Sequence, residues 1–253
     1  MARAGRKSTS SPRPDYIKWA LVAGAAIIVV LVGFLARRYW WHPTVNVDKY
    51  PIKGIDVSGH NSITDWNAVA QSGITFVYIK ASEGASYTNP HFHQQYTGAR
   101  KAGLMVGCYH FFRKNRDGVA QASHFIASVA RLQLDLPLVV DVEDWNGDRG
   151  IDEATTRRRL TDMVSTLERH GFKVMIYTNG DGHKAYYLPA LDGHDLWLSS
   201  FNEPEKMQHV GHRIQQYSHW GTIDGVEGDV DLNVFMGSKQ EWNQWLDSLQ
   251  LNP

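Results

Sequence analysis

Between residues 54 and 177 the sequence alternates between short apolar runs typical of strands and longer segments with helical periodicity. A strand, a helix and a second strand in series place the two strands parallel in one sheet. The strand-like runs are 54–58, 76–80, 105–111, 138–141 and 173–177, and the helical candidates lie near 63–72, 89–102, 118–132 and 152–170. This alternation predicts an α/β fold.

Beyond residue 190 the strand-like runs 195–199, 213–218 and 230–235 follow one another without helical periodicity between them. Too little chain remains there for full crossover helices. We therefore expect a modified TIM-like barrel, (β/α)5(β)3, in which five β/α units precede three strands joined mainly by loops.

The barrel is expected to span residues 54–236 and to be followed by a C-terminal helix over 237–253. Four apolar residues of this last segment have helical spacing, namely Trp242, Trp245, Leu246 and Leu249. A stripe of this kind predicts a helix that packs on the barrel.

The N-terminal part of the chain contains an uncharged stretch, residues 19–36, that is long enough to cross a bilayer as a helix. A signal peptide has a shorter apolar core and ends in small residues, whereas this stretch is followed by Arg37, Tyr39 and Trp40, which suit a membrane interface. We therefore expect one transmembrane signal anchor that is not cleaved. A buried core helix is the alternative.

Basic residues set the expected orientation of this anchor. Five of them precede the stretch and two follow it directly, so the positive-inside rule predicts a cytoplasmic tail over residues 1–18. Residues 37–53 would then form a juxtamembrane linker. The barrel would lie on the outer, periplasmic face of the cell membrane.

Composition excludes some classes of partner and of stabilisation. The 253 residues include 26 basic and 26 acidic side chains, so the formal net charge is zero and no overall field attracts nucleic acid. The single cysteine, Cys108, excludes an internal disulfide, so the outward-facing domain must be stable through packing alone. We expect one monomeric catalytic domain.

A pair of carboxylates follows the apolar run at 136–140. Side chains at positions i and i+2 of a strand share one face, so Asp141 and Glu143 are expected to point into one pocket. Two acids at this range tend to separate their pKa values, which leaves one protonated and the other charged. Glycoside hydrolysis uses such a pair, although acids that end a strand also commonly face water.

Further acids fall at the ends of other predicted strands, and we place Asp56, Glu83 and Asp231 there. Parallel barrel strands bring their carboxyl ends together on one face, so these acids should converge with the first pair. Aromatic side chains with polar edges lie on or beside the same strands and suit stacking on sugar rings. These candidates are Tyr78, Tyr109, His110, Tyr177, Trp197 and Tyr217.

Other chemistries are less consistent with the sequence. His91 and His93 lie on a predicted helix, where positions i and i+2 diverge, so they make a poor metal pair. The sequence has no Gly-rich phosphate loop and no nucleophile elbow. We therefore assign no metal and no cofactor.

Six collinear motifs between residues 54 and 236 resemble those of glycoside hydrolase family 25, the N-acetylmuramidases or lysozymes of the Chalaropsis type. They are GIDVS at 54–58, IKASEG at 79–84, GLMVGCYHF at 103–111, DVE at 141–143, QYS at 216–218 and VDLNVF at 230–235. Two departures are visible: Gln215 stands where the family often has Trp, and Cys108 replaces a usual Ala.

The resemblance implies a flattened (β/α)5(β)3 barrel that cleaves the β-1,4 bond between N-acetylmuramic acid and N-acetylglucosamine in peptidoglycan. It makes Glu143 the general acid and gives it three acidic companions, Asp141, Asp56 and Asp231. The substrate's 2-acetamido group would be the nucleophile, while direct attack by a carboxylate or by an inverting water stays open.

Two other functions remain as alternatives. A membrane-tethered module on a hydrolase scaffold would bind cell wall without cutting it. A phage-type endolysin would release its anchor from the membrane, in keeping with the small residues Ala20, Ala23, Gly24, Ala25, Ala26 and Gly33.

Overall fold

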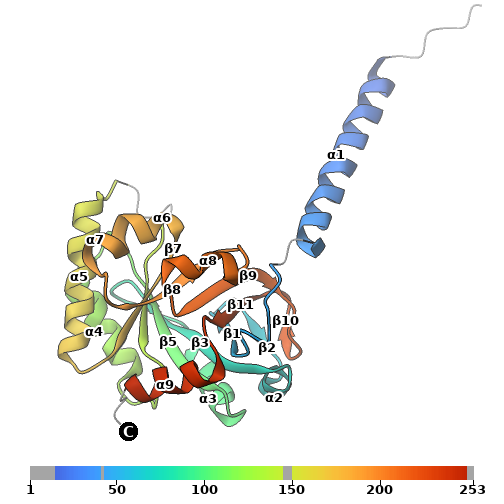
Figure 1. Ribbon diagram of the computed structural model, residues 1–253. Coiled ribbons are helices and arrows are strands. Elements are labelled where there is room, and N and C mark those ends of the chain that lie inside the picture. The colour runs from blue at the N-terminus through green and yellow to red at the C-terminus, as the bar shows by residue number, and fades with distance from the viewer. Residues whose placement is uncertain (1–14, 41–42, 145–149, 250–253) are drawn as a thin grey trace, which may run out of the picture. The chain divides into compact units, whose positions relative to one another are not determined.

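The computed structural model describes residues 15–40, 43–144 and 150–249, and the chain forms two units, Met1–His42 and Pro43–Pro253 (Figure 1). Most of the predicted cytoplasmic tail, 1–14, and the end of the predicted C-terminal helix, 250–253, lie outside the described residues.

The first unit contains one helix, α1 (Asp15–Trp40), of 26 residues. Its segment Tyr16–Leu35 has a mean hydropathy of 2.3, and none of it is buried. Twenty helical residues extend about 30 Å, the thickness of the hydrocarbon core of a bilayer. By length and composition, α1 is therefore a candidate membrane span, and it includes the predicted anchor.

The second unit is a closed barrel of eight strands. Around the barrel the order is β1, β11, β9, β8, β7, β6, β5 and β3, and β3 pairs with β1 to close the ring. The strands are β1 (Lys53–Val57), β3 (Ile74–Glu83), β5 (Met105–Phe111), β6 (Leu138–Asp141), β7 (Val174–Asn179), β8 (Asp195–Ser199), β9 (Ile214–Gly221) and β11 (Val230–Phe235). The predicted TIM-like barrel is confirmed.

One strand differs in direction from the prediction. Seven strands of the ring are parallel, but β11 runs antiparallel to both of its neighbours, β1 and β9. We inferred that Asp231 reaches the site from the carboxyl end of a parallel strand, and this inference is wrong. A short connection after β9 returns the chain in a hairpin, so Asp231 lies near the start of β11 at the same rim.

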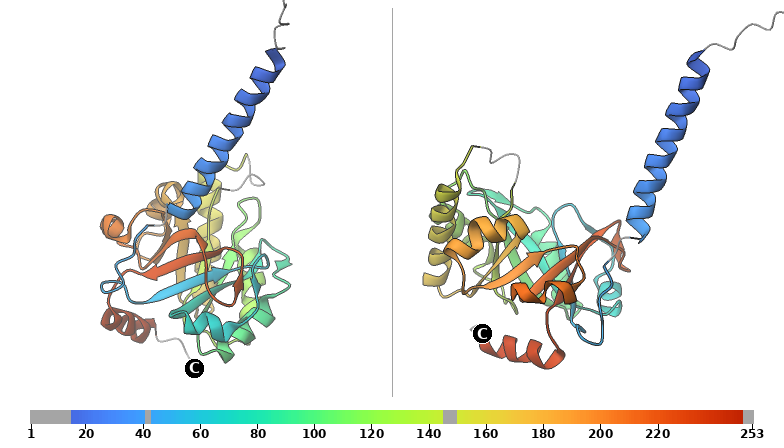
Figure 2. Two further views of the ribbon diagram at one scale, coloured as in Figure 1. Left: turned by 90° about the vertical axis from the view of Figure 1, so that its right-hand side faces the viewer. Right: turned by 45° about the horizontal axis from the view of Figure 1, so that its top comes forward.

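Helices cover the outside of the barrel. Those that follow the first strands are α2 (Trp66–Gln71), α3 (Phe92–Lys101), α4 (Gly118–Val129) and α5 (Glu153–Arg169), and Figure 2 shows α4 and α5 side by side. Asp side chains cap three of them because a carboxylate accepts hydrogen bonds from the free N–H groups of a first turn. The caps are Asp65 on α2, Asp117 on α4 and Asp152 on α5.

The later connections contain only short helical pieces, in line with the lack of helical periodicity there. Between β7 and β8 lie α6 (Gly180–Gly182), the π-helix η2 (His183–Tyr187) and α7 (Leu188–Ala190), and between β8 and β9 lie α8 (Pro204–Met207) and the 3-10 helix η3 (Gln208–Val210). Two small pairings were not predicted. They join β2 (Ser62–Ile63) to β10 (Val226–Glu227) and β4 (Tyr87–Thr88) to β3.

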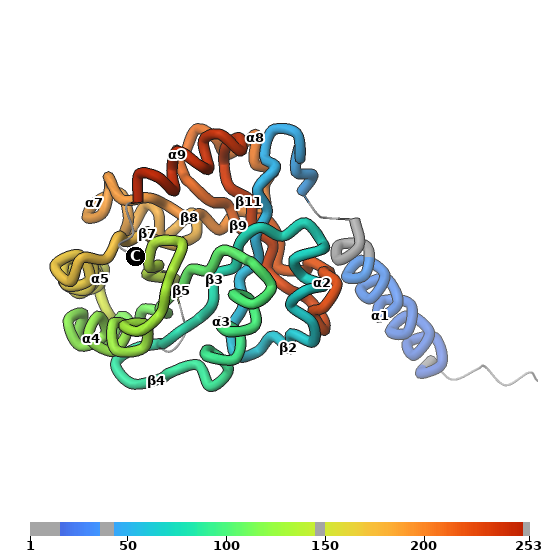
Figure 3. The backbone as a smooth tube through the Cα atoms, turned by 90° about the horizontal axis from the view of Figure 1, so that it is seen from below, coloured from blue at the N-terminus to red at the C-terminus, as the bar shows by residue number. Residues whose placement is uncertain are grey.

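The hydrophobic core has two layers, one between strands and helices and one inside the barrel. The terminal helix α9 (Lys239–Leu249) belongs to the inner layer, because its Trp242 stacks on Phe76 at 5.4 Å and its Trp245 stacks on Phe235 at 5.6 Å. Figures 1 and 3 show α9 at the lower end of the barrel. It closes the end at which the parallel strands begin.

Gly107 of β5 allows a close approach of two strands inside this inner layer. It stands in register with Tyr78 of β3, and a Cβ atom at residue 107 would lie 2.2 Å from Tyr78 Cε1. Tyr78 is fully buried and has no room to move. We expect Gly107→Ala to lower the free energy of unfolding by about 1–3 kcal/mol, as overpacked cores do, in denaturant titrations. Gly180→Ala is the matched control because no described residue lies within 4 Å of its Cβ position, and equal effects of both substitutions would contradict this packing.

Candidate active site

The rim at which the parallel strands end contains a cavity of about 210 Å³, which we call the rim cavity. All eight strands of the ring, or the residues directly after them, contribute to its lining. The lining residues are Asp56, Ser58, Lys80, Tyr109, Phe111, Asp141, Glu143, Tyr177, Trp197, Gln216, His219 and Asp231. Side chains far apart in sequence therefore meet in one place.

Four acids of this lining form two pairs on opposite sides of the ring. Asp56 and Asp231 are directly opposed in the register of β1 and β11, which brings their Cα atoms within about 5.5 Å. Asp141 and Glu143 belong to β6 and its extension, which lies across the barrel from β11 in the strand order. The two pairs therefore face each other across the rim cavity.

The backbone beyond β6 explains why Asp141 and Glu143 share a face. The intervening Val142 donates its N–H to the Tyr177 carbonyl at 2.9 Å, and its own carbonyl accepts from Thr178 Oγ1 at 2.7 Å. These bonds continue the pairing with β7 past the end of the strand. The alternation of side chains is thus kept, and positions i and i+2 both point into the rim cavity.

Two buried amides hold Asp56 in place. Its Oδ2 accepts hydrogen bonds from Asn233 Nδ2 at 2.7 Å and from Gln216 Nε2 at 3.0 Å. The amide oxygens are also occupied, because Asn233 accepts from Trp197 Nε1 at 2.8 Å and Gln216 accepts from the Tyr177 hydroxyl at 2.8 Å. With every partner assigned, each amide has one orientation, and the Asp56 carboxylate has one position.

Burial controls the ionisation of these acids. It raises the pKa of Asp56 well above its usual range, and the neighbouring charge of Asp231 adds to this rise. Burial also raises the pKa of Asp141 well above its usual range, and Glu143 adds to it. The Glu143 pKa is raised by burial too, while His219 opposes the rise. Because negative charges this close repel each other, these buried acids keep protons at pH values at which exposed carboxyl groups are ionised.

Two basic side chains lie beside these acids. His219 Nδ1 lies 2.7 Å from Asp231 Oδ1. Lys80 Nζ pairs with Glu83 Oε2 at 2.6 Å and lies 4.7 Å from the centre of the Phe111 ring. Lys80 also opposes the rise in the pKa of Asp141.

Three of the predicted sugar-binding aromatics line the rim cavity: Tyr109, Tyr177 and Trp197. Two others do not, and for these the prediction of sugar contact is wrong. Tyr78 is fully buried inside the barrel, where its hydroxyl donates to the Pro137 carbonyl at 3.4 Å. His110 is fully buried on the helix side of β5, where it packs on Phe125, and burial lowers its pKa to about 3.

Glu83 and Tyr217 are also absent from the lining. Glu83 is bound by Lys80 and by Arg113, whose Nε donates to Glu83 Oε1 at 2.8 Å, so its carboxylate is used in an ion-pair network. Tyr217 follows Gln216 in β9 and therefore points to the other face of the strand; burial raises its pKa to about 12.

Sequence reasoning missed Ser58, Lys80, Phe111, Gln216 and His219 in the lining and Asn233 behind Asp56. Strand alternation was the available signal for several of them. Phe111 lies two residues after Tyr109, and Lys80 lies two residues after Tyr78, one layer nearer the rim. Among the described residues, no group of three or more His, Cys, Asp or Glu side chains has the arrangement of a metal site.

Comparisons with known proteins identify the family of this chain. The family model described as "Glycosyl hydrolases family 25" matches residues 55–226. The autolytic lysozyme of Clostridium acetobutylicum is 34% identical over 184 residues, which cover 73% of this chain and 56% of that protein. This chain thus spans little more than half of the length of that relative. Lysozyme M1 of Streptomyces globisporus is 33% identical over 211 residues, with 76% of this chain and 70% of that protein covered.

Solved structures share the fold. The family 25 glycosyl hydrolase of Bacillus anthracis superimposes with a TM-score of 0.73 at 30% identity and covers 81% of this chain and 97% of its own. The bacterial lysozyme of Streptomyces coelicolor gives a TM-score of 0.67 at 27% identity, with 78% and 98% covered. The family model alone covers more than half of the residues, and the barrel fold agrees with the solved structures of the family. The chain is therefore a glycoside hydrolase that belongs to family 25.

Proposed function

We propose that the protein is an N-acetylmuramidase that hydrolyses the β-1,4 bond between N-acetylmuramic acid and N-acetylglucosamine in peptidoglycan. The observation that carries this proposal is the pair of acids on each side of the rim cavity, since glycosidases place carboxyl groups on both sides of the bond they cut. Relatives named lysozyme and N,O-diacetylmuramidase support the choice of substrate.

In the proposed mechanism Glu143 is the general acid. Burial raises its pKa, and the charge of Asp231 adds to the rise, so Glu143 keeps a proton under conditions in which a surface glutamate is ionised. It donates this proton to the leaving glycosidic oxygen. After the leaving sugar departs, the Glu143 carboxylate removes a proton from the attacking water.

Asp141 orients the nucleophile, which is the acetamido oxygen of the substrate. Asp141 Oδ1 is buried and has no hydrogen-bond partner among the described residues, so it is available to accept the acetamido N–H. Because the two acids repel each other, the pair of Asp141 and Glu143 keeps one proton over a range of pH. With that proton on Glu143, the Asp141 carboxylate is ionised and stabilises the positive charge of the oxazolinium-like intermediate. This route gives products of retained configuration, whereas direct attack by water gives inverted ones.

Asp56 and Asp231 face this reaction from the opposite side of the rim cavity. Their position suits hydrogen bonds to sugar hydroxyls, and the charge of Asp231 adds to the field that holds a proton on Glu143. The fixed position of Asp56 serves this role because preorganised groups need no rearrangement during the reaction.

The products of digestion test the substrate and the bond. Soluble fragments of purified cell wall should carry N-acetylmuramic acid at their reducing ends. Fragments that end in N-acetylglucosamine would instead identify a glucosaminidase. A zymogram on purified wall without a cleared zone would identify a module that binds wall without cutting it.

The pH dependence of activity follows from the raised pKa values. The general acid must be protonated, so kcat/KM should fall as pH rises through the raised pKa values of Asp141 and Glu143. At low pH kcat/KM should also fall, because the remaining carboxylate of this pair takes up a proton. Initial rates on purified wall across the pH range measure this profile. The surface substitution Glu168→Gln should leave it unchanged, and activity that stays level into the alkaline range would contradict the role of Glu143.

We also propose that α1 anchors the enzyme in the cell membrane, with the N-terminus in the cytoplasm and the barrel on the outer face. The length and the apolar composition of α1 support this topology, as do the basic residues before it. Protease added to spheroplasts should digest the barrel, and intact cells should protect it. A barrel found free of membrane would point to a released, endolysin-like form.

A further inference from the structure

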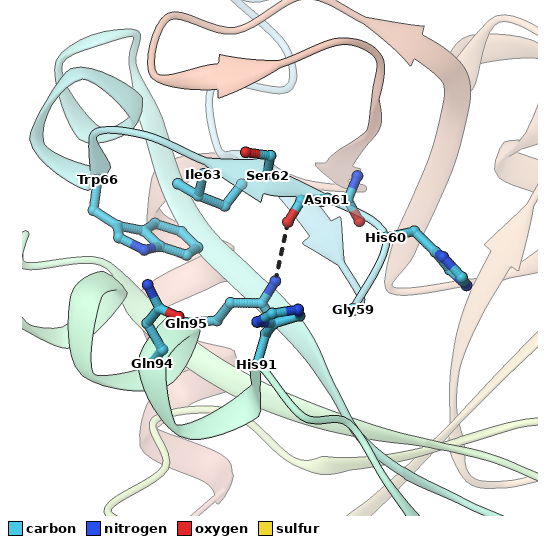
Figure 4. A pocket seen from close by; sticks show the side chains of 9 residues that line it. All are labelled: Gly59, His60, Asn61, Ser62, Ile63, Trp66, His91, Gln94 and Gln95. Carbon is cyan, nitrogen blue, oxygen red and sulfur yellow. Dashed lines mark hydrogen bonds between the residues drawn. The ribbon is translucent and has the colours of Figure 1, made fainter.

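A second cavity, of about 270 Å³, lies beside the rim cavity, and we call it the side cavity. Figure 4 shows it between β2 with the turn before it on one side and the first turns of α3 on the other. Its lining residues are Gly59, His60, Asn61, Ser62, Ile63, Trp66, His91, Gln94 and Gln95. None of the residues assigned to catalysis is among them.

The two cavities share one wall, the turn formed by residues 58–61. Ser58 lines the rim cavity, and the next residue, Gly59, lines the side cavity. The turn is held by Asn61 Oδ1, which accepts from the Ser58 N–H at 2.8 Å, and by Gln95 Nε2, which donates to the Ser58 carbonyl at 2.7 Å. The side cavity therefore begins one residue along this turn from the rim cavity.

The chemistry of the side cavity suits an uncharged sugar. Its described lining contains no Asp, Glu, Lys or Arg, and it includes the imidazole rings of His60 and His91. It offers the amide of Gln94, the indole of Trp66 and the hydroxyl of Ser62, which donates to Glu227 Oε2 at 2.9 Å and can still accept a hydrogen bond. Amides and hydroxyls match the hydroxyl and N-acetyl groups of an amino sugar, and an indole packs against a sugar ring. A phosphate or a peptide carboxylate would instead call for Lys or Arg.

The side cavity is also held in shape by its surroundings. β2 pairs with β10 through Ile63 and Val226, and Thr64 donates its N–H to the Gly225 carbonyl at 2.8 Å. Trp66 packs so closely on α3 that a Cβ atom at Gly98 would lie 2.1 Å from its ring. A preformed site binds without a large ordering cost.

We propose that the side cavity is a distal subsite that binds an N-acetylated hexosamine of the same glycan strand that is cut in the rim cavity. This inference rests on the proposed function, because it takes the ligand to be a peptidoglycan strand. A strand long enough to fill both cavities is then bound more tightly than a short one, so the enzyme prefers long glycans.

The test compares substrates of two lengths in the full chain. Gln94 is exposed on α3, so Gln94→Ala removes one amide and Gln94→Trp fills the space without disturbing the core. The substrates are a peptide-free octasaccharide and a tetrasaccharide of alternating N-acetylglucosamine and N-acetylmuramic acid. In both Gln94 variants, the ratio of kcat/KM for the octasaccharide to kcat/KM for the tetrasaccharide should fall about threefold to tenfold. Gln71→Trp, at an exposed position on α2 outside the lining, is the matched control.

A binding measurement separates this inference from the proposed function. In the Glu143→Gln background, calorimetric titration with long chitooligosaccharides should show weaker binding when Gln94→Trp is added. If the ratio and the titration are unchanged by both Gln94 substitutions, the subsite is overturned. The subsite is also overturned if the Gln94 substitutions change kcat/KM only for substrates that carry peptides, because the side cavity would then recognise the peptide. An enzyme that cuts no glycan refutes the proposed function, while the titration still decides the subsite.

Discussion

Replacing Glu143 by Gln is expected to reduce the hydrolysis of purified cell wall by about 100- to 10,000-fold, the usual contribution of a general acid. The amide has nearly the size of the carboxyl group but has no proton to donate to the leaving oxygen. The side chain lies at the rim, where it closes no part of the core, so the fold and the affinity for glycan should be retained. Turnover of wall, thermal unfolding and pull-down by insoluble wall measure these three properties.

The matched control is Glu153→Gln, which makes the same chemical change on an exposed side chain in the first turn of α5. It should leave turnover unchanged. Activity of the Glu143 variant close to that of the wild type would remove this residue from the mechanism. Loss of binding together with loss of activity would show that the side chain holds substrate rather than transferring a proton.

Replacing Asp141 by Asn is expected to remove most of the activity, by about 100-fold or more, because a neutral amide cannot stabilise the positive charge that develops beside it. Retained activity would contradict the proposed role in orienting the acetamido group. Rates should be compared with those of Asp162→Asn, an exposed position on α5. The configuration of the first product, followed by NMR, tests the same step.

The same variant should differ from the wild type in its stability at different pH values. Burial raises the pKa of Asp141 in the folded state, so the folded protein holds a proton that the unfolded chain releases. The contribution of this proton to the free energy of unfolding is fully present at pH values below the pKa of Asp141 in the unfolded chain. It is lost as pH rises through the pKa of Asp141 in the folded protein. Asn does not titrate, so the free energy of unfolding of the variant should fall less steeply with rising pH in that window. If denaturant titrations give the same dependence of the free energy of unfolding on pH for both proteins, burial does not raise the pKa of Asp141.

Most of the barrel could be predicted because local patterns agree with the final fold. The run that ends at Asp141 is apolar on both faces, as a strand between a helix layer and a filled barrel must be. The signals for α5 are equally local. They are its helical spacing of apolar residues, the Asp152 cap before it, and Gly171 in a left-handed conformation after it. The same alternation places Asp141 and Glu143 on one face.

The errors concern facts that only the assembled structure contains. Tyr109 and His110 are neighbours on one strand, so only one of them can face the rim cavity, and the sequence does not say which. Tyr78 has the correct face but lies too deep in the barrel. The direction of β11 depends on a hairpin with β9, and the roles of Gln216 and Asn233 depend on contacts with Asp56 across the ring.

The position of β11 in the chain has a consequence for biosynthesis. This strand supplies Asp231 and Asn233 and seals the ring between β1 and β9, yet it is the last strand of the barrel to leave the ribosome. A nascent polypeptide that stops before residue 230 has two open edges and an incomplete set of carboxyl groups. Interrupted translation therefore yields fragments that lack the complete set of rim acids, and we expect such fragments to be inactive.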